Sequence, residues 1–445
     1  MNDELISWMS GLAHRLFPIR RSLSGEGIAE SLAIMAEVVP PSVCMHFASG
    51  SKVFDWVIPP VWHCRSATLT GPDGVVVADF ARSSLEVVNY SHPVDATYEL
   101  EDLLSEGRLY SMPDLPDAIP YVTSYYSDHW GFCLPHRVLE QLPRGRYQAK
   151  IDARFDPTGS IPVVQSVLPG RSSREIVLSS YLCHPEMGNN ELSGPLVLAA
   201  LYRALSQETD LLFTYRFILG PETVGSVALL SAMLEHFRRY MYGGFVLTCL
   251  GGPEPMLRIK APANISGPFP EFLQDYVRMT DGWRMTQFSP DEGSDERQYC
   301  SPGADLPMGQ VARTPYQEYA EYHSSADDLD FMDVTKVADS AERILALLHN
   351  LEDLTPHNVT FGAGEPQLGK RGLYPNTNAP GEGLNSSQES AESRWTRLHL
   401  EVVAASKGTQ CLSSLSSKGF SLAEISESVS LLRAAGLIEP DLDPE

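Results

Sequence analysis

The fold is decided by one stretch of the chain, Ser179-Ser180-Tyr181-Leu182-Cys183-His184-Pro185-Glu186-Met187-Gly188-Asn189-Asn190-Glu191-Leu192-Ser193-Gly194-Pro195. The apolar run 176–182 leads into this stretch and predicts a buried strand, and residues 196–205 after it predict a helix. In an open α/β sheet, ligands bind in the crevice beyond the carboxyl ends of the strands. His184 stands at such a strand end, where it is either a metal-binding or catalytic group or a loop residue with a satisfied hydrogen bond.

The alternation of strand and helix continues along the chain. Residues 213–219 and 244–250 predict further strands, residues 224–240 a helix between them, and residues 333–351 a closing amphipathic helix. Alternation of this kind is typical of a mostly parallel or mixed sheet with helices on its faces. We therefore predict the α/β fold class, with the main domain at residues 141–355.

Regions outside this domain differ from it in their pattern of apolar and polar residues. Residues 1–48 look helical and form its first part, whereas residues 49–140 hold short apolar or alternating runs broken by Pro and Gly. The second pattern predicts a small β-rich inserted domain. Residues 356–392 combine Gly, Pro, Asn and Ser with little apolar periodicity and predict a linker. Residues 393–445 are compact and helical and predict a small winged-helix domain.

The C-terminal region carries clear helix signals. Ser421 and Glu424 have the spacing of a capping box. The helix that follows has one apolar stripe, made of Leu422, Ile425, Val429 and Leu432. Acidic residues around this helix argue against DNA binding, so packing or dimerisation is the role that we expect.

The composition excludes several classes of partner. The 445 residues carry a formal net charge of −24 at pH 7, which repels phosphates, so we expect no nucleic-acid partner and no membrane partner. The N-terminus has no basic region followed by an apolar core, and no apolar run approaches the ~20 residues that span a bilayer. The seven cysteines lack paired spacing, which argues against a disulfide framework. We expect a cytoplasmic protein, and homo-oligomer formation stays open.

Two further side chains are candidates to join His184. Glu222 follows a predicted strand, and its carboxylate is expected in the same crevice, as a metal ligand or as the general base for a metal-bound water. A glutamate favoured by the helix dipole is the alternative interpretation. His323 lies in an aromatic and acidic segment, where Asp327 and Asp328 are candidates to orient its imidazole. Two histidines and one glutamate suit zinc, which takes N and O ligands.

A polar run from Ser294 to Cys300 mixes both charges with an aromatic ring. This composition suits a polar substrate pocket and a solvated surface loop equally well. Candidate substrate-binding residues are those whose charge would read the ends of a small substrate or whose hydroxyl would donate to an oxyanion. They are Asp295, Glu296, Arg297, Tyr299 and Tyr322.

The order of these residues resembles the zinc-dependent exopeptidase superfamily, which contains the leucyl-type aminopeptidases and the glutaminyl cyclases. More closely, the chain is similar to the bacterial "aminopeptidase-like domain" proteins, which are often linked to polysaccharide or natural-product gene clusters. The likeness spans nearly the whole chain. It rests on Leu16-Phe17-Pro18-Ile19, Arg21-Ser22-Leu23-Ser24-Gly25, Lys52-Val53-Phe54-Asp55-Trp56, Thr123-Ser124-Tyr125-Tyr126, Trp130-Gly131-Phe132-Cys133-Leu134, Cys183-His184-Pro185, Asn190-Glu191-Leu192-Ser193-Gly194-Pro195, Ser294-Asp295-Glu296-Arg297-Gln298-Tyr299-Cys300 and Gly369-Lys370-Arg371-Gly372-Leu373-Tyr374-Pro375.

The resemblance implies a site built for two zinc ions that share a bridging Asp, with two His, a second Asp and a Glu as further ligands and a separate Glu as base. By position, His184 and His323 match the two histidines, and Glu222 matches the base. Asn190 stands in place of the bridging Asp, and Thr223 stands in place of the ligand Glu.

These departures leave a two-zinc site under-neutralised. Thr248 or Cys249 replaces the second Asp, so Glu222 is the only plausible anionic ligand against a charge of +4. We therefore expect one zinc ion at most. Its candidate ligands are His184, Asn190, Glu222 and His323.

The favoured function is that of a mononuclear zinc aminopeptidase or amidohydrolase for a small aminoacyl or peptide-like substrate, in natural-product or polysaccharide biosynthesis. Glu222 would shuttle the proton. The alternatives are an acyl transferase or cyclase on an aminoacyl intermediate, and a non-catalytic binding or scaffold protein that keeps the fold. We expect Trp130 and the Tyr125-Tyr126 pair of the inserted domain to cover the crevice, which favours small substrates.

Overall fold

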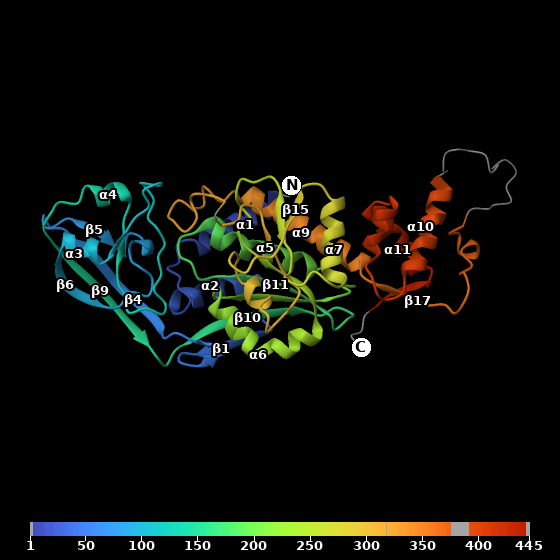
Figure 1. The fold of residues 1–445 in the computed structure, drawn as a ribbon, viewed down its shortest axis with the longest axis horizontal. Helices are drawn as coiled ribbons and strands as arrows, with labels where there is room; N and C mark the ends of the chain where they lie inside the picture. Colours follow the sequence, from blue (N-terminus) through green and yellow to red (C-terminus); the bar gives the residue numbers. More distant parts are fainter. Residues whose placement is uncertain (1–2, 317, 375–390, 442–445) are drawn as a thin grey trace.

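The computed structural model describes residues 3–316, 318–374 and 391–441. These residues form three parts in a row: a β-rich domain at one end, an α/β domain in the middle and a mostly helical unit at the other end (Figure 1). The chain begins in the middle part, crosses to the β-rich domain and returns. The β-rich domain is therefore an insertion into the α/β domain.

The middle part is built on a mixed sheet of eight strands, in the order β1-β10-β12-β11-β13-β16-β14-β15. The buried strand β11 (Glu175–Tyr181) lies between β12 (Thr214–Gly220) and β13 (Met241–Leu247) and is parallel to both. Antiparallel pairs occur on either side of this group. The other strands are β1 Val43–Ala48, β10 Ser160–Leu168, β14 Leu257–Lys260, β15 Trp283–Thr286 and β16 Met308–Ala312. The predicted α/β class with a mixed sheet is confirmed.

Helices cover both faces of this sheet. Successive residues of a strand point to opposite faces, and the central strands carry apolar side chains on both, so each face needs a cover. Ile176 and Leu178 of β11 belong to one core, and Val177 between them belongs to the other. Full burial of each such side chain stabilises the fold by about 1.5–3 kcal/mol. The first core contains residues of α1 Asp3–Leu16, α2 Glu26–Ala36, α5 Ser193–Leu205, α7 Pro268–Met279 and α9 Val334–Leu354. The second contains residues of α6 Val224–Tyr240 and α8 Glu296–Tyr299.

The inserted domain has its own antiparallel sheet, in the order β5-β4-β9-β6, and its own core. Its elements are β4 Val61–Thr70, β5 Val76–Asp79, η1 Ser84–Glu86, β6 Val94–Glu99, α3 Leu100–Ser105, β7 Leu109–Tyr110, β8 Phe132–Cys133, α4 His136–Glu140 and β9 Arg146–Asp156. Strand β9 begins after residue 140, so the sheet of the inserted domain reaches beyond the end that we drew from the sequence. The short hairpin of β2 (Lys52–Val53) and β3 (Trp56–Val57) precedes this sheet.

The C-terminal unit joins helices to a small two-stranded sheet. Its elements are β17 His357–Val359, η3 Gly369–Arg371, α10 Ala391–Ala405, η4 Leu412–Lys418, α11 Leu422–Ala434 and β18 Ile438–Pro440. The predicted capping box of Ser421 and Glu424 is confirmed at the start of α11. Much of the predicted linker, residues 375–390, lies outside the described residues, but its start pairs with the end of the unit through β17 and β18.

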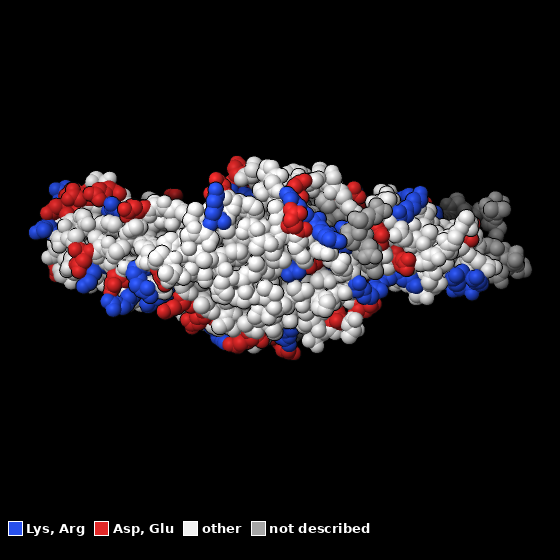
Figure 2. Space-filling view, turned by 90° about the horizontal axis from the view of Figure 1, so that it is seen from below, with Lys and Arg blue, Asp and Glu red and all other residues white. Residues whose placement is uncertain are grey.

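Helix α11 packs against α9 of the α/β domain. The hydroxyl of Ser426 donates to Asp353 of α9, and Arg433 Nη1 lies 4.0 Å from the same carboxylate. On the face in Figure 2, Lys and Arg side chains are interspersed with Asp and Glu. Within the described part of the chain, no helix is long and apolar enough to cross a membrane.

Candidate metal centre and active site

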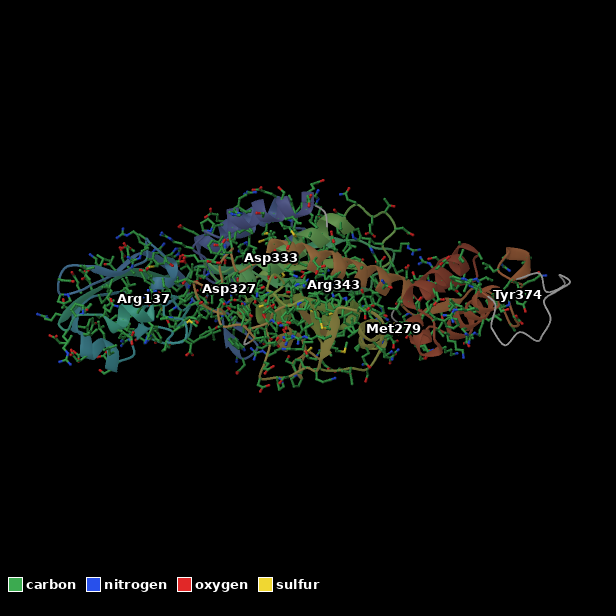
Figure 3. All side chains as sticks on the ribbon, turned by 90° about the horizontal axis from the view of Figure 1, so that it is seen from above. Arg137, Met279, Asp327, Asp333, Arg343 and Tyr374 are labelled. Atoms are coloured by element: carbon green, nitrogen blue, oxygen red, sulfur yellow. The ribbon has the colours of Figure 1, made fainter. Side chains whose placement is uncertain are left out.

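Three neighbouring parallel strands end at the same edge of the sheet, and each leads into a loop with a polar side chain. His184 follows β11, Glu222 follows β12 and Cys249 follows β13. A late loop after β16 brings His323 and Asp327 to this edge. Asp327 is labelled in Figure 3, where the α/β domain meets the inserted domain. The crevice expected from the sequence is therefore at the junction of two domains.

His184 is held by a buried chain of charged groups. Its Nδ1 lies 2.8 Å from Glu191 Oε2, and Glu191 Oε1 lies 3.4 Å from Arg21 Nε, which also donates to the backbone oxygen of His184 at 2.9 Å. Burial lowers the pKa of His184, but the neighbouring Cys183 and Glu191 outweigh it, so the pKa is raised. Burial raises the pKa of the Cys183 thiol to about 11, so this thiol keeps its proton at neutral pH. The contact with Glu191 directs Nδ1–H to the Glu191 carboxylate, and Nε2 faces Glu222, where it must release its proton before it binds a metal.

The two carboxylate oxygens of Glu222 have different neighbours, His184 on one side and Ser294 on the other. Its Oε2 lies 3.7 Å from His184 Nε2, and its Oε1 accepts a hydrogen bond from the hydroxyl of Ser294. Burial raises the pKa of Glu222, while the nearby His184 opposes that shift. The next residue, Thr223, has a positive φ of 57° and donates its N–H to Asp295 Oδ1 at 2.6 Å. The loop that presents Glu222 is thus strained and fixed from behind.

Asn190 lies in a π-helical turn, Gly188–Leu192, and its amide is oriented by a circuit of hydrogen bonds. Asn190 Nδ2 donates to the Tyr181 hydroxyl at 3.0 Å, which lies 2.6 Å from Thr248 Oγ1. Thr248 donates in turn to the backbone oxygen of Asn190 at 3.3 Å. The amide nitrogen of Asn190 also donates to Cys249 Sγ at 3.9 Å, and Oδ1 of Asn190 remains buried without a hydrogen-bond partner.

His323 has an environment that keeps its imidazole neutral. Burial lowers the pKa of His323 well below its usual value, and the charge of His184 lowers it further. Its ring stacks on Tyr322 with the ring centres 3.9 Å apart, and its φ is +53°. Nε2 of His323 is buried without a hydrogen-bond partner. A neutral imidazole with a free nitrogen is the form that binds a metal.

His184, Asn190, Glu222 and His323 offer the nitrogen and oxygen donors that zinc takes. The donor atoms of His184, Glu222 and His323 do not all lie within 4.8 Å of one another among the described residues. Buried polar atoms without partners often mark a missing ion or water, and at the site they include His323 Nε2 and Asn190 Oδ1. Two imidazoles bound through Nε2 to one tetrahedral zinc have ring centres about 5 Å apart, and those of His184 and His323 are 5.1 Å apart. Two zinc ligands lie about 3.4 Å from each other, close to the 3.7 Å between His184 Nε2 and Glu222 Oε2.

Among the described residues, one group of side chains near His184 has the spacing of metal ligands. Cys183, His184 and Glu191 place one donor atom each within 4.8 Å of the others. This group lies on the Nδ1 side of His184, where Glu191 already contacts Arg21 and the Cys183 thiol keeps its proton. We therefore interpret it as the support of His184.

Asp327 has a different task from the one we predicted. It was a candidate to orient the imidazole of His323, but its carboxylate accepts from the N–H groups of Asn189 at 2.6 Å and Asn190 at 2.9 Å, and from the Tyr319 hydroxyl at 2.9 Å. Burial raises the pKa of Asp327 to about 6. The residue ties the late loop to the turn that carries Asn190.

The predicted substrate-binding residues of the 294–300 run lie mostly behind Glu222. Asp295 accepts a hydrogen bond from the Thr223 N–H. Burial is the main cause that raises the pKa of Asp295 to about 8. Glu296 is fully buried, 3.3 Å from Lys260 Nζ and 3.1 Å from Gln310 Nε2. Tyr299 is fully buried in the core beneath α6. This placement favours support of the Glu222 loop over direct contact with a substrate.

The remaining two candidates are partly accessible. Arg297 is half-buried, and its Nη1 lies 3.5 Å from the backbone oxygen of Pro290. Tyr322 is half-buried beside His323, and burial raises its pKa, so that its hydroxyl keeps its proton. Of the five predicted substrate-binding residues, Tyr322 is the one in direct contact with a candidate metal ligand.

Sequence reasoning missed three groups that the site depends on. Glu191 follows Asn190 directly and carries a charge, so its position in the loop was the available signal. Arg21 belongs to a motif of the resemblance, but nothing in its spacing linked it to residue 191. Tyr121 of the inserted domain lies edge-on against both His184 and His323, with ring centres 5.1 and 5.3 Å apart, and no local pattern announced it.

The sheet and the residues at its edge define an aminopeptidase-like α/β domain, followed by a winged helix. The chain belongs to the family described as "Domain of unknown function (DUF4910)", whose model matches residues 10–354. A model described as "winged helix-turn-helix" matches residues 355–440, which include the whole of the predicted linker.

A curated protein and a solved structure, both from Clostridium acetobutylicum, are similar to this chain. One, described as "Putative polysaccharide biosynthesis protein with aminopeptidase-like domain", is 35% identical over 368 residues, which are 82% of each chain. The other is the crystal structure of a "putative peptidase", with a TM-score of 0.83 and 30% identity over 98% of this chain and 96% of that one. The aminopeptidase-like domain and the C-terminal winged helix that we predicted are confirmed.

More distant structures share the fold. A zinc aminopeptidase from Bacillus subtilis has a TM-score of 0.54 at 13% identity, over 78% of this chain and 93% of its own. A peptidase M28 precursor from Shewanella amazonensis has a TM-score of 0.53 at 10% identity, over 78% of this chain and 91% of its own. At these identities the likeness extends to the fold alone.

Proposed function

We propose that the chain is a mononuclear zinc aminopeptidase or amidohydrolase that acts on a small aminoacyl or peptide-like substrate. One observation carries the proposal. The donor atoms His323 Nε2 and Asn190 Oδ1 are buried without partners beside His184 and Glu222, in an arrangement that one zinc ion would complete. The four residues are the metal ligands expected from the sequence.

The chemistry divides between the ion and the protein. A bound zinc would lower the pKa of a water molecule and polarise a carbonyl group. If His184, Asn190 and His323 hold the ion and water takes its fourth position, Glu222 would take the proton of that water and return it to the leaving amine. Its raised pKa brings it closer to neutral pH, where such transfer is most efficient. The hydrogen bond from Ser294 to Oε1 would keep Oε2 turned toward His184.

The surroundings support one ion over two. Thr248, in place of the second Asp of the superfamily, is committed to the hydrogen-bond circuit around Asn190. Cys249 is the other candidate there, but burial raises the pKa of its thiol to about 11, so it is neutral at pH 7. A second divalent ion would therefore find no anionic ligand in Thr248 or Cys249.

A second candidate is transfer of an acyl group to an amine, as in a transferase or cyclase. His184 and Asn190 are only 4% and 2% exposed, and a site that excludes water favours an amine over water as the nucleophile. The name of the Clostridium relative makes a polysaccharide or related biosynthetic intermediate a reasonable substrate for either reaction.

Metal content and one substitution test the main proposal. The purified full-length protein is expected to hold about one zinc per chain, and Glu222→Gln should lower turnover of a responsive aminoacyl amide ~10²–10⁴-fold without unfolding the protein. Glu235→Gln, the same exchange at an exposed position of α6, is the control and should leave turnover unchanged. Protein that holds no zinc and gains no activity when zinc is added would contradict the proposal.

A further inference from the structure

The inserted domain contacts the loop that carries His323 through a short run of backbone hydrogen bonds. The N–H of Tyr121 donates to the backbone oxygen of His323 at 2.8 Å, and the N–H of Ser325 donates to the oxygen of Ile119 at 2.9 Å. The N–H of Ile119 donates to Ser325 Oγ at 2.9 Å. His323 has a positive φ, which a non-glycine residue keeps only where its surroundings hold it. The inserted domain is one part of those surroundings.

The same segment brings a pair of tyrosines to the candidate metal centre. The ring of Tyr121 is 8% exposed and meets the His323 ring edge-on, at an interplanar angle of 87° and a distance of 5.3 Å. It meets the His184 ring at 61° and 5.1 Å. The Tyr121 hydroxyl lies 3.0 Å from the hydroxyl of Tyr125, which is half-buried. Trp130, which we expected over the crevice, packs instead against Tyr98 in the core of the inserted domain.

The tyrosine pair holds one more proton than its internal hydrogen bond uses. Two hydroxyls carry two protons, and one of these makes the bond between them. Within the described residues, neither hydroxyl has another hydrogen-bond partner. One O–H therefore remains available as a donor. Both hydroxyls keep their protons at neutral pH, because the ordinary pKa of tyrosine is about 10.

We propose that the Tyr121–Tyr125 pair is a catalytic group supplied by the inserted domain, whose spare O–H donates a hydrogen bond to the carbonyl oxygen of the substrate as negative charge develops there. This inference rests on the proposed function, because the pair lies against the two candidate zinc-binding histidines. A donor held ready in a buried site stabilises a developing oxyanion strongly. It assigns to this pair the role that the sequence suggested for Tyr299 or Tyr322.

The position of the pair also limits the class of substrate. Tyr121 is packed against both histidines, so the inserted domain covers this side of the candidate metal centre. An amide whose carbonyl lies one residue from a free amino end fits a site closed on that side, whereas an internal bond of a long peptide needs both sides open. The inferred substrates are short aminoacyl amides.

Conservative substitutions in the full-length, zinc-loaded protein test the inference. Tyr121→Phe and Tyr125→Phe each remove a hydroxyl and keep the ring. Each should lower kcat for an aminoacyl amide about 10–100-fold, below the effect of losing a complete oxyanion donor, with KM and zinc content little changed. The double variant should be close to the more damaged single variant, because the two hydroxyls act as one unit. Tyr126→Phe is the control, since its exposed hydroxyl donates to the backbone oxygen of Val57.

A binding measurement separates a donor from a merely structural tyrosine. An aminoacyl boronic acid, which forms a tetrahedral anion, should lose affinity in Tyr121→Phe by the same factor as kcat/KM, whereas the free amino acid product should bind as before. Full activity in the double variant would overturn the inference and leave the proposed function intact. Loss of zinc from Tyr121→Phe would also overturn it, because the hydroxyl would then be structural. A wild-type protein that neither turns over amides nor binds the boronic acid would overturn the proposed function, and the inference with it.

Discussion

The ring centres of His184 and His323 lie 5.1 Å apart, yet the two residues belong to loops that are held in place by different parts of the molecule. The loop after β11 fixes His184 from within the α/β domain, through buried Glu191 and Arg21. The late loop fixes His323 from outside, through the inserted domain, and leaves Nε2 without a partner. The difference shows that the position of His184 is fixed by the α/β domain itself. The position of His323 depends on the inserted domain, and its Nε2 still lacks a partner.

The largest effect is expected from breaking the buried ion pair on the His184 side. Arg21→Met removes the guanidinium from the fully buried Glu191, which keeps its contact with His184, and should lower the free energy of unfolding by about 3–5 kcal/mol. Arg15→Met removes an exposed pair with Glu37 and should cost far less. Denaturant unfolding of the two variants measures the difference. Equal small losses would mean that His184 is not held as described.

The next effect concerns the His323 side and the addition of zinc. Zinc at one hundred times its Kd should raise the free energy of unfolding of the wild-type protein by about 2.7 kcal/mol. His323→Ala should lose most of this gain, because it removes a ligand whose nitrogen has no other partner. His349→Ala changes an exposed histidine and should keep the gain. Thermal unfolding with and without zinc measures this gain in stability for all three proteins. A gain in His323→Ala equal to that of the wild type would show that His323 is not a zinc ligand.

A smaller effect is expected on zinc affinity when Glu191, which holds His184, loses its charge but keeps its size. Glu191→Gln keeps an acceptor for Nδ1 but loses the charge, and should weaken zinc binding about 10–100-fold. Glu186→Gln is the matched control in the same loop, since Glu186 binds Ser83 and Ser84 of the inserted domain and not His184. Competition with a zinc chelator measures both affinities. If Glu186→Gln weakened zinc as much as Glu191→Gln, the effect would come from the loop as a whole.

The smallest effect comes from one contact between the inserted domain and the late loop. Ser325→Ala removes the acceptor of the Ile119 N–H and should cost about 0.5–1.5 kcal/mol. Hydrogen exchange should quicken at Tyr121 and Ser325 and stay unchanged in β11. Ser105→Ala, an exposed serine elsewhere in the inserted domain, serves for comparison. Unchanged exchange at Tyr121 would show that this contact does not hold the late loop.

The elements of the fold could be predicted where the apolar pattern is continuous. The strand expected at 176–182 is β11 at Glu175–Tyr181, and the helix expected at 224–240 is α6 at Val224–Tyr240. Because parallel strands bring their ends together, His184 and Glu222 could be expected at one edge from the sequence alone. The end of the inserted domain was harder to place, since β9 alternates like the strands around it and its pairing with β4 and β6 assigns it.

The partners of the site residues were out of reach, because they depend on packing between distant segments. Charge alone made Asp295 and Glu296 look like substrate-binding groups, but their burial behind Glu222 follows from the docking of α8 under α6. Tyr121 reaches the histidines only because the inserted domain folds back on the late loop. Nothing near residue 121 or residue 323 in the sequence predicts that contact.

The central claim, that a single zinc ion joins His184 and His323, is tested most directly by X-ray absorption at the zinc edge of the purified full-length protein. The account predicts one zinc per chain with two imidazole nitrogens and oxygen ligands, and loss of one imidazole in His323→Ala. A spectrum with a sulfur ligand from Cys183, or two zinc ions at a short metal–metal distance, would contradict it.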